Sequence, residues 1–124
     1  MRLLLDTHVL LWWFAGERLV PEAKRLIAAP DSDVFVSAAS PWEAEIKAQM
    51  GKLTVRGDLA AQVAHDGFIE LKVSFAHGVA AARLPPHHRD PFDRMLVAQA
   101  QLEGLTIVTR DPVFDSYAVA ILAA

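Results

Sequence analysis

The chain has 124 residues, 53% of them hydrophobic, with 12 lysines and arginines against 15 aspartates and glutamates, and no cysteine. This length is typical of one domain over residues 1–124, and the lack of cysteine excludes a disulfide scaffold, a thiolate zinc site and a cysteine nucleophile. A formal net charge of −3 argues against binding nucleic acid over a broad basic surface, and the apolar content excludes disorder.

Short apolar runs alternate with helical patterns in the first part of the chain. The patterns predict strands at Leu3–Leu5 and Val34–Ser37, and helices from Thr7 to a stop at Gly16 and over Pro21–Ala28. The segment Ser40–Glu43 then predicts a helix start, with serine as the cap, proline at the first position and glutamate three residues after the cap. We expect this helix to end near Gly51.

The alternation continues to the end of the chain. The patterns predict helices over Asp58–His65 and Phe75–Arg83, and strands at Phe68–Val73, Leu105–Val108 and Val119–Leu122. Asp90 and Pro91 repeat the cap and proline pattern and begin a helix to Glu103, with Gly104 just past its end. Strands separated by helices pair in parallel, so the predicted fold class is α/β, a sandwich around a central parallel sheet.

Neither a membrane span nor a secretory signal fits the sequence. The longest apolar runs, Val9–Ala15 and Tyr117–Ala124, are far shorter than the roughly 20 residues of a spanning helix. The apolar N-terminal stretch resembles a signal peptide, but Asp6 and His8 interrupt it. We therefore expect a cytoplasmic protein.

Four acidic residues fall where a parallel sheet places its working crevice, at the carboxyl ends of the strands. Asp6 directly follows the first strand, and Asp111 comes three residues after the last apolar residue of the Leu105–Val108 strand. Glu43 and Asp93 each lie in the first turn of a helix. Each acid also has a structural alternative. Asp6 could cap the next helix, and Glu43 could be the partner in a capping box. Asp93 could lie at the positive end of a helix dipole, and Asp111 could be a turn residue.

Taken together, the four acids favour a metal centre. Carboxylates that share a pocket repel one another unless a cation lies among them. An all-oxygen ligand set suits Mg²⁺ or Mn²⁺. One or two such ions hold water as a nucleophile and neutralise a phosphodiester in its transition state. The predicted chemistry is metal-dependent hydrolysis of a phosphodiester.

Four blocks of sequence carry a family resemblance: LLLDTHVLLW, VSAASPWEAEIKAQMGKL, HHRDPFDRMLVAQA and LTIVTRD. In this order and spacing they resemble a PIN domain and, more closely, the toxin nuclease of a VapBC-type, type II toxin–antitoxin pair. The resemblance runs from Arg2 to the end of the chain. It implies a three-layer α/β/α sandwich and a Mg²⁺- or Mn²⁺-dependent endoribonuclease that cleaves RNA. It further implies a homodimer, silenced by a cognate VapB-like antitoxin encoded beside it.

The resemblance also assigns the catalytic, metal-binding acids. The family's four positions fall on Asp6, Glu43, Asp93 and Asp111, of which the fourth is the most variable in such proteins. Asp90 and Asp115 are near neighbours, and either could assist. Asp90 has a strong structural alternative as a helix cap.

Other polar residues flank the acids. Thr7, Ser37 and Thr109 could hold the carboxylates, metal-bound water or substrate, with ordinary turn chemistry as the alternative. The candidates to bind phosphate are Arg89, Arg94 and Arg110. For Arg94 a plain surface role fits equally well.

Histidine, lysine and tryptophan side chains complete the candidates. His87 and His88 could contact RNA or simply be solvated, and Lys47 could pair with Glu43 or touch substrate. The surroundings of the three tryptophans favour packing in the core or in a dimer over base stacking. These residues are Trp12, Trp13 and Trp42.

Two other functions remain open. A catalytically inactive PIN-like binding module would share the fold, although the presence of all four acids argues against it. A phospho-accepting receiver domain has a similar length and element order. It needs paired acids after the first strand and a late lysine, whereas this chain has one acid there and no lysine beyond Lys72.

Overall fold

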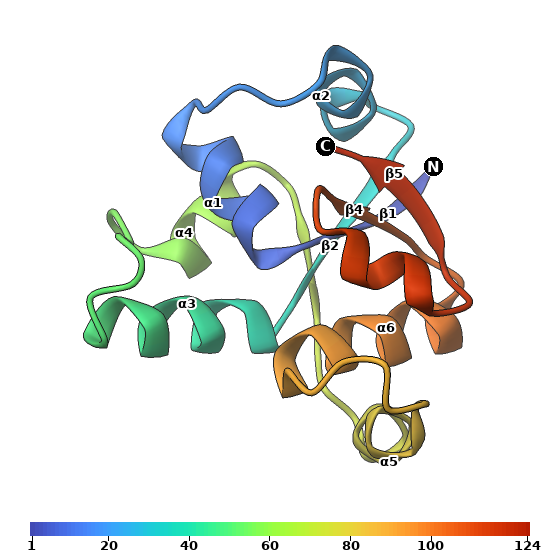
Figure 1. Ribbon diagram of the computed structural model, residues 1–124. Coiled ribbons are helices and arrows are strands. Elements are labelled where there is room, and N and C mark those ends of the chain that lie inside the picture. The colour runs from blue at the N-terminus through green and yellow to red at the C-terminus, as the bar shows by residue number, and fades with distance from the viewer.

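The computed structural model describes residues 1–124 and contains one five-stranded sheet (Figure 1). Its strands are β1 (Arg2–Leu5), β2 (Asp33–Ser37), β3 (Ile69–Leu71), β4 (Thr106–Thr109) and β5 (Ala120–Ala123). Every pairing is parallel, and the strand order is β3-β2-β1-β4-β5. The prediction of a central parallel sheet is confirmed. A receiver domain has the order 2-1-3-4-5, so that alternative is wrong.

The first strand lies in the middle of the sheet, which explains its unbroken leucine run. Leu3 is aligned with Val34 of β2 on one side and with Thr106 of β4 on the other. All three leucines are fully buried, because helices cover both faces of the sheet.

Six α-helices and one short 3-10 helix complete the chain. They are α1 (Thr7–Ala15), α2 (Pro21–Ala28), α3 (Ala39–Gln49), α4 (Leu59–His65), α5 (Phe75–Arg83), α6 (Pro91–Glu103) and η1 (Pro112–Ser116). The longest, α6, has 13 residues, and no helix is long and apolar enough to cross a membrane.

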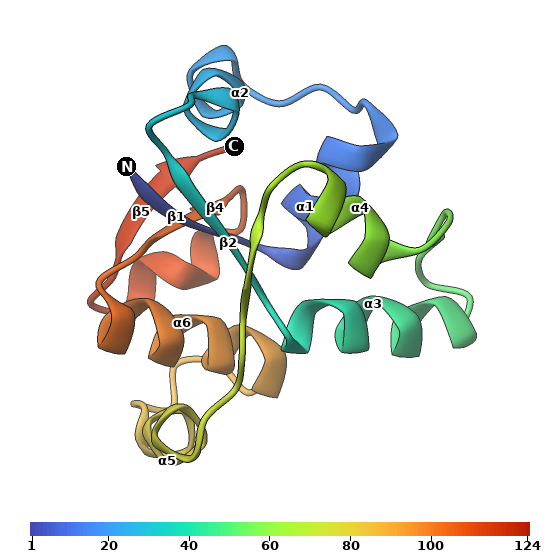
Figure 2. The ribbon, with the colours of Figure 1, turned by 180° about the vertical axis from the view of Figure 1, so that it is seen from behind.

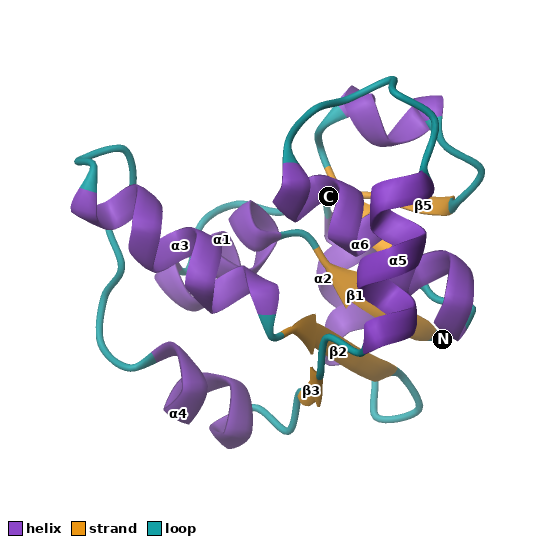
Figure 3. Ribbon diagram, turned by 90° about the horizontal axis from the view of Figure 1, so that it is seen from below, coloured by secondary structure: helices purple, strands orange, loops and turns teal.

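The two faces of the sheet carry separate cores. Leu3 and Leu5 pack with residues of α1 and α2 and with Val63 of α4, whereas Leu4 packs with α6 and with Phe114 of η1. Seen from below, α6 and α5 lie in front of the sheet and α2 lies behind it (Figure 3). The expected three-layer α/β/α sandwich is therefore confirmed.

The start of α3 differs from the prediction. The helix begins at Ala39, and the hydroxyl of Ser37 accepts the Ala39 N–H at 3.1 Å. Ser40 is therefore inside the first turn rather than at the cap, and Glu43 closes no capping box. Ser37 ends β2 and caps the next turn itself, so the helix starts earlier than the proline pattern suggests.

The start of α6 agrees with the prediction. Oδ1 of Asp90 accepts the N–H groups of Phe92 and Asp93 at 2.8 and 3.3 Å, and Pro91 occupies the first helical position. At its other end Gly104 adopts a φ of 67°, the left-handed conformation that ends a helix most easily with glycine. This cap directs the first turn of α6, with Asp93, towards the ends of β1 and β4.

Candidate active site

An acidic cavity of about 400 Å³ opens at the carboxyl ends of the central strands. It collects side chains from the β1–α1 junction, α3, the start of α6 and the β4–η1 junction, segments that converge there (Figure 2). All four predicted acids line it. The lining is Asp6, His8, Trp12, Glu43, Lys47, His88, Asp90, Asp93, Arg110, Asp111 and Pro112.

Asp6 lies at the bottom of the site and joins two strands. Its N–H donates to the carbonyl of Val108 at 3.0 Å, which extends the β1–β4 pairing by one residue. Oδ2 accepts the Thr109 hydroxyl at 2.8 Å, and the side chain is 5% exposed. Burial raises the pKa of Asp6, against the opposing effect of the Thr109 hydrogen bond.

Glu43 is more deeply buried, at 2% exposure, and both of its oxygens have donors. Oε1 lies 2.7 Å from the Thr7 hydroxyl, which is also 3.1 Å from the hydroxyl of Ser40. A hydroxyl carries one proton, so Thr7 donates to the carboxylate and Ser40 donates to Thr7. Oε2 accepts from the ammonium of Lys47 at 2.5 Å. The partial burial of Lys47 is outweighed by this hydrogen bond and by nearby carboxylates, so the pKa of Lys47 is raised.

Asp93 faces Asp6 and Glu43 from the first turn of α6. Burial above all, and then the negative charges of Asp90, Asp6 and Glu43, raise the pKa of Asp93 to about 7. The hydrogen bond between Oδ2 of Asp93 and Nε2 of His88, at 2.8 Å, acts in the opposite direction. The carboxylates therefore repel one another in this cavity, as the sequence predicted.

A divalent cation fits this donor set. His88, Asp90 and Asp93 each offer a ligand atom within 4.8 Å of the others, although Oδ1 of Asp90 is already engaged as the helix cap. Most of the other possible ligands around the cavity are carboxylate oxygens, which Mg²⁺ and Mn²⁺ prefer, and His8 adds one imidazole. Asp111 lies at the rim, exposed, and its Oδ1 accepts the N–H of Val113 at 2.9 Å.

The family model of the PIN domain matches residues 3–120. The chain belongs to the PIN domain family. No curated protein matches its sequence.

Several solved structures share the fold of this PIN domain. A chain of a toxin–antitoxin complex from Klebsiella pneumoniae has 23% sequence identity and a TM-score of 0.68, with 96% of this chain and 94% of that chain covered. A chain of VapBC2 from Rickettsia felis, bound to a promoter DNA fragment, has 13% identity and a TM-score of 0.71 over 99% and 98% of the chains. A chain of FitAcB from Neisseria gonorrhoeae has 23% identity and a TM-score of 0.63 over 97% and 96%.

The two threonines expected beside the acids lie in the floor of the PIN domain site. Thr7 and Thr109 are both buried, and their hydroxyls hold Glu43 and Asp6 respectively. The expectation that they hold carboxylates is therefore confirmed, while their burial keeps them from an RNA chain. Ser37 serves the turn into α3 instead.

The three arginines differ in their surroundings. The guanidinium of Arg94 donates to backbone carbonyls at the end of α5 and on the α5–α6 connection, among them those of Ala81 and Leu84 at 2.9 Å. These contacts engage Arg94 in the fold, and its geometry offers nothing to a phosphate. Arg110 lines the cavity but donates to the carbonyls of Ala124 and Arg18, and its guanidinium lies over the Trp12 ring at 4.3 Å. Arg89 is exposed and makes no hydrogen bond or ion pair, so it remains a candidate for phosphate.

The three remaining candidates are close to the site. His87 packs against Tyr117, Asp115 is exposed on η1 outside the cavity, and His88 is a cavity residue. His8 also lines the cavity, and this was not predicted from the sequence. His8 lies two residues after Asp6, on the first turn of α1. That position indicates a site residue only once this turn is known to face α3 and α6.

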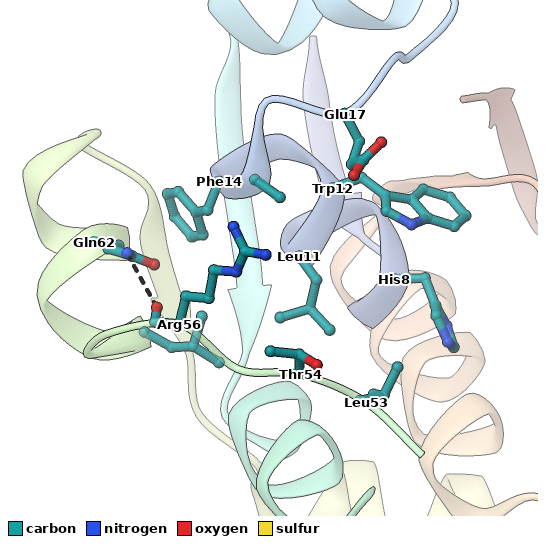
Figure 4. Close-up of a pocket in the computed structure, with 11 residues that line it drawn as sticks. His8, Leu11, Trp12, Phe14, Glu17, Leu53, Thr54, Arg56 and Gln62 are labelled. Atoms are coloured by element: carbon teal, nitrogen blue, oxygen red, sulfur yellow. Dashed lines mark hydrogen bonds between the residues drawn. The ribbon is translucent and has the colours of Figure 1, made fainter. Parts of the chain in front are cut away.

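A second, less polar cavity of about 330 Å³ adjoins the first (Figure 4). It lies between α1, the connection from α3 to α4, and α4, and it shares His8 and Trp12 with the acidic cavity. Figure 4 shows the side chain of Arg56 extending between Phe14 and Leu11. A ligand that fills the acidic cavity can therefore continue over the same helix into this one.

Proposed function

We propose that this PIN domain is a Mg²⁺- or Mn²⁺-dependent endoribonuclease, the toxin of a VapBC-type toxin–antitoxin pair. The observation that carries the proposal is the convergence of Asp6, Glu43, Asp93 and Asp111 on one cavity from four separate segments. Burying carboxylates side by side is unfavourable without a cation, and a nuclease uses such a cation directly. Asp6, Asp93 and Asp111 supply oxygens to the metal, with Asp90 as an assisting acid, and Glu43 shapes the charge of the site.

The reaction is hydrolysis of an RNA phosphodiester. Water adds to phosphorus, one P–O ester bond breaks, and the departing ribose oxygen takes a proton. A Mg²⁺ or Mn²⁺ ion held by the carboxylates of the cavity would lower the pKa of a bound water molecule and neutralise charge on the phosphate. The hydroxyls of Thr109 and Thr7 keep Asp6 and Glu43 in place, and the exposed Arg89, next to the cavity residues His88 and Asp90 in the chain, is proposed to bind the RNA backbone.

The proposed partners are a VapB-like antitoxin and a second copy of the chain. Structures that share this fold are a toxin–antitoxin complex, a VapBC complex and FitAcB. A cognate antitoxin, encoded beside this chain, would keep the nuclease silent. A reading frame for a small DNA-binding protein next to this one would support this assignment.

Cleavage of a mixed RNA pool tests the activity. The wild type is expected to cut RNA with Mg²⁺ or Mn²⁺ and to stop when EDTA is added. Asp6→Asn should lose cleavage, because a buried ligand loses its charge. Asp115→Asn is the matched control and should cleave normally, since Asp115 lies outside the cavity.

The competing function is a PIN-like binding module without catalysis. It predicts no cleavage of any RNA with either metal, while the fold and any antitoxin binding persist. Cleavage that persists in Asp6→Asn would point to a contaminating nuclease, and loss of cleavage in Asp115→Asn as well would point to a damaged fold.

A further inference from the structure

Both oxygens of Glu43 already accept a hydrogen bond from another side chain. Thr7 donates to Oε1 at 2.7 Å, and the ammonium of Lys47 donates to Oε2 at 2.5 Å. The carboxylate is almost completely buried, so a divalent ion that approached Oε2 would have to share it with the ammonium or displace the ammonium. Mg²⁺ is surrounded by tightly held water, and its positive charge would repel the ammonium of Lys47 if both were bound to the same carboxylate oxygen.

Lys47 is the cation of the cavity whose charged group makes no bond to the backbone. Its side chain is 27% exposed and lines the acidic cavity, and one of its three N–H groups is used by Glu43. Arg110, the other cation there, is held by two backbone carbonyls and by the Trp12 ring. Arg110 is therefore tied to the backbone, whereas Lys47 has a single partner in the site and keeps two N–H groups for an incoming phosphate.

We propose that Lys47 is the second cation of the catalytic centre. Glu43 is then a positioning residue that holds the ammonium at the cavity, and the centre binds a single divalent ion through Asp6, Asp93 and Asp111. Lys47 contacts the RNA phosphate, in the place that a second metal ion takes in two-metal nucleases. The contact to RNA rests on the proposed function, whereas the number of metal ions does not.

An ordinary ion pair one turn apart on a helix is the alternative. Exposed pairs of this kind contribute little to stability, and either partner can be replaced without a large effect. The Lys47–Glu43 pair differs because the carboxylate is buried beneath the ammonium and anchored on its other side by Thr7. Because both oxygens of this buried carboxylate have donors, its hydrogen bond holds the ammonium of Lys47 in one position at the cavity.

Titration with Mn²⁺ alone, followed by calorimetry, tests the number of metal ions and the role of Glu43. The wild type is expected to bind one ion. Glu43→Gln keeps the shape and the Thr7 contact, so it should bind one ion with a Kd within about threefold of the wild type. Asp93→Asn is the control for a true ligand and should weaken Mn²⁺ binding at least tenfold. Two ions in the wild type, or a tenfold loss in Glu43→Gln, would make Glu43 a metal ligand and overturn the proposal.

Cleavage of RNA in saturating Mn²⁺ tests the role of Lys47. Lys47→Met should lower kcat about 100-fold, the usual effect of removing one donor that stabilises charge in a transition state. The same variant should bind Mn²⁺ as tightly as the wild type or more tightly, since a repelling charge is gone. Lys52→Met, an exposed lysine outside the cavity, is the matched control and should change neither quantity.

Near-normal cleavage by Lys47→Met would reduce Lys47 to a structural ion pair and overturn its role. If the wild type cleaves no RNA at all, the nuclease proposal fails. The Mn²⁺ titrations still decide whether Glu43 binds a second metal ion or holds the ammonium of Lys47.

Discussion

Three carboxylates of this PIN domain, those of Asp6, Glu43 and Asp93, are buried or nearly so at one cavity. A buried charge without a partner costs several kcal/mol, so each of them needs a donor. The donors are a threonine for Asp6, a threonine and a lysine for Glu43, and a histidine for Asp93. At the scale of single residues, the buried carboxylates therefore lower the stability of the metal-free protein.

Replacing Asp93 by asparagine should make the metal-free protein more stable at pH 8. The pKa of Asp93 is about 7 in the folded chain and close to 3.8 when unfolded. Between these values the folded state binds more protons, so this group lowers the free energy of unfolding as pH rises from about 4 to about 7. Allowing for solvent screening, Asp93→Asn should gain about 1–2 kcal/mol at pH 8 and nothing near pH 4.

Urea unfolding in EDTA at several pH values measures this effect. Asp115→Asn, on an exposed carboxylate of η1, should leave the pH profile unchanged. A loss of stability in Asp93→Asn at pH 8 would mean that its pairing with His88 outweighs the repulsion among the acids.

Replacing Thr7 by valine should destabilise the fold. Valine has the same shape but donates no hydrogen bond, so Oε1 of Glu43 is left buried without its donor. An unsatisfied buried group of this kind costs about 1–3 kcal/mol. Urea unfolding should show this loss, whereas Thr54→Val, at an exposed threonine, should change stability by less than about 0.5 kcal/mol. Equal stability of both variants would show that the Thr7 hydroxyl does not support the site.

At the scale of the elements, Arg94 of α6 and Tyr117 hold the connection between α5 and α6. Arg94 donates to carbonyls at the end of α5 and on that connection, and the Tyr117 hydroxyl donates to the carbonyl of Pro85 at 3.0 Å and accepts the N–H of His88 at 3.1 Å. This connection carries His88 and leads to the Asp90 cap. The two side chains therefore fix the segment that positions the α6 acids.

Arg94→Met should loosen this connection. Removing the guanidinium leaves several carbonyls without donors, which should cost about 2 kcal/mol and speed hydrogen exchange at residues 84–90. Arg89→Met is the matched control, because Arg89 makes no hydrogen bond, and it should leave both stability and exchange unchanged. Equal exchange rates in the two variants would contradict the anchoring role of Arg94.

At the scale of the whole molecule, metal binding should stabilise the fold. The acidic cavity joins segments from both ends of the chain, so a bound ion favours the folded state alone. At about 100 times its Kd, Mg²⁺ should add about 2.7 kcal/mol, or roughly 8 °C in Tm. Thermal unfolding with Mg²⁺, against K⁺ at equal ionic strength, measures the shift. Asp6→Asn should show little of it, and an equal shift in that variant would place the ion elsewhere.

The proposed homodimer can be tested on one exposed face of α3. Trp42, Ile46 and Met50 recur every four residues there, and Trp42 is 64% exposed although it packs edge-on against Phe92. Contiguous exposed apolar side chains mark contact surfaces. Light scattering should give twice the mass of one chain for the wild type and one chain mass for Ile46→Glu. Val79→Glu, at an exposed apolar residue of α5, should remain dimeric. A monomeric wild type would contradict the dimer.

Much of this molecule was predictable from local patterns. The three leucines after Arg2, the cap and proline at Asp90–Pro91 and the glycine after Glu103 all have effects within a few residues, so their elements lie where expected. The start of α3 was misplaced because Ser37, Ser40 and Pro41 compete to begin the same helix. That competition is decided by contacts with β2 and α1, which no local pattern contains.

The sequence by itself determined the α/β class, the family and the acids at the strand ends. Hydrophobic periods and helix caps are local patterns, and the four motif blocks can be read directly from the chain. Only the tertiary structure decided what each polar side chain faces. It placed the guanidinium of Arg94 among backbone carbonyls and the ammonium of Lys47 against Glu43. It also placed the hydroxyls of Thr7 and Thr109 in hydrogen bonds to the acids. Those partners lie up to 103 residues apart, as for Thr109 and Asp6. The direction of a side chain depends on neighbours that folding alone brings together, and so the charge and donors of the site were settled in three dimensions.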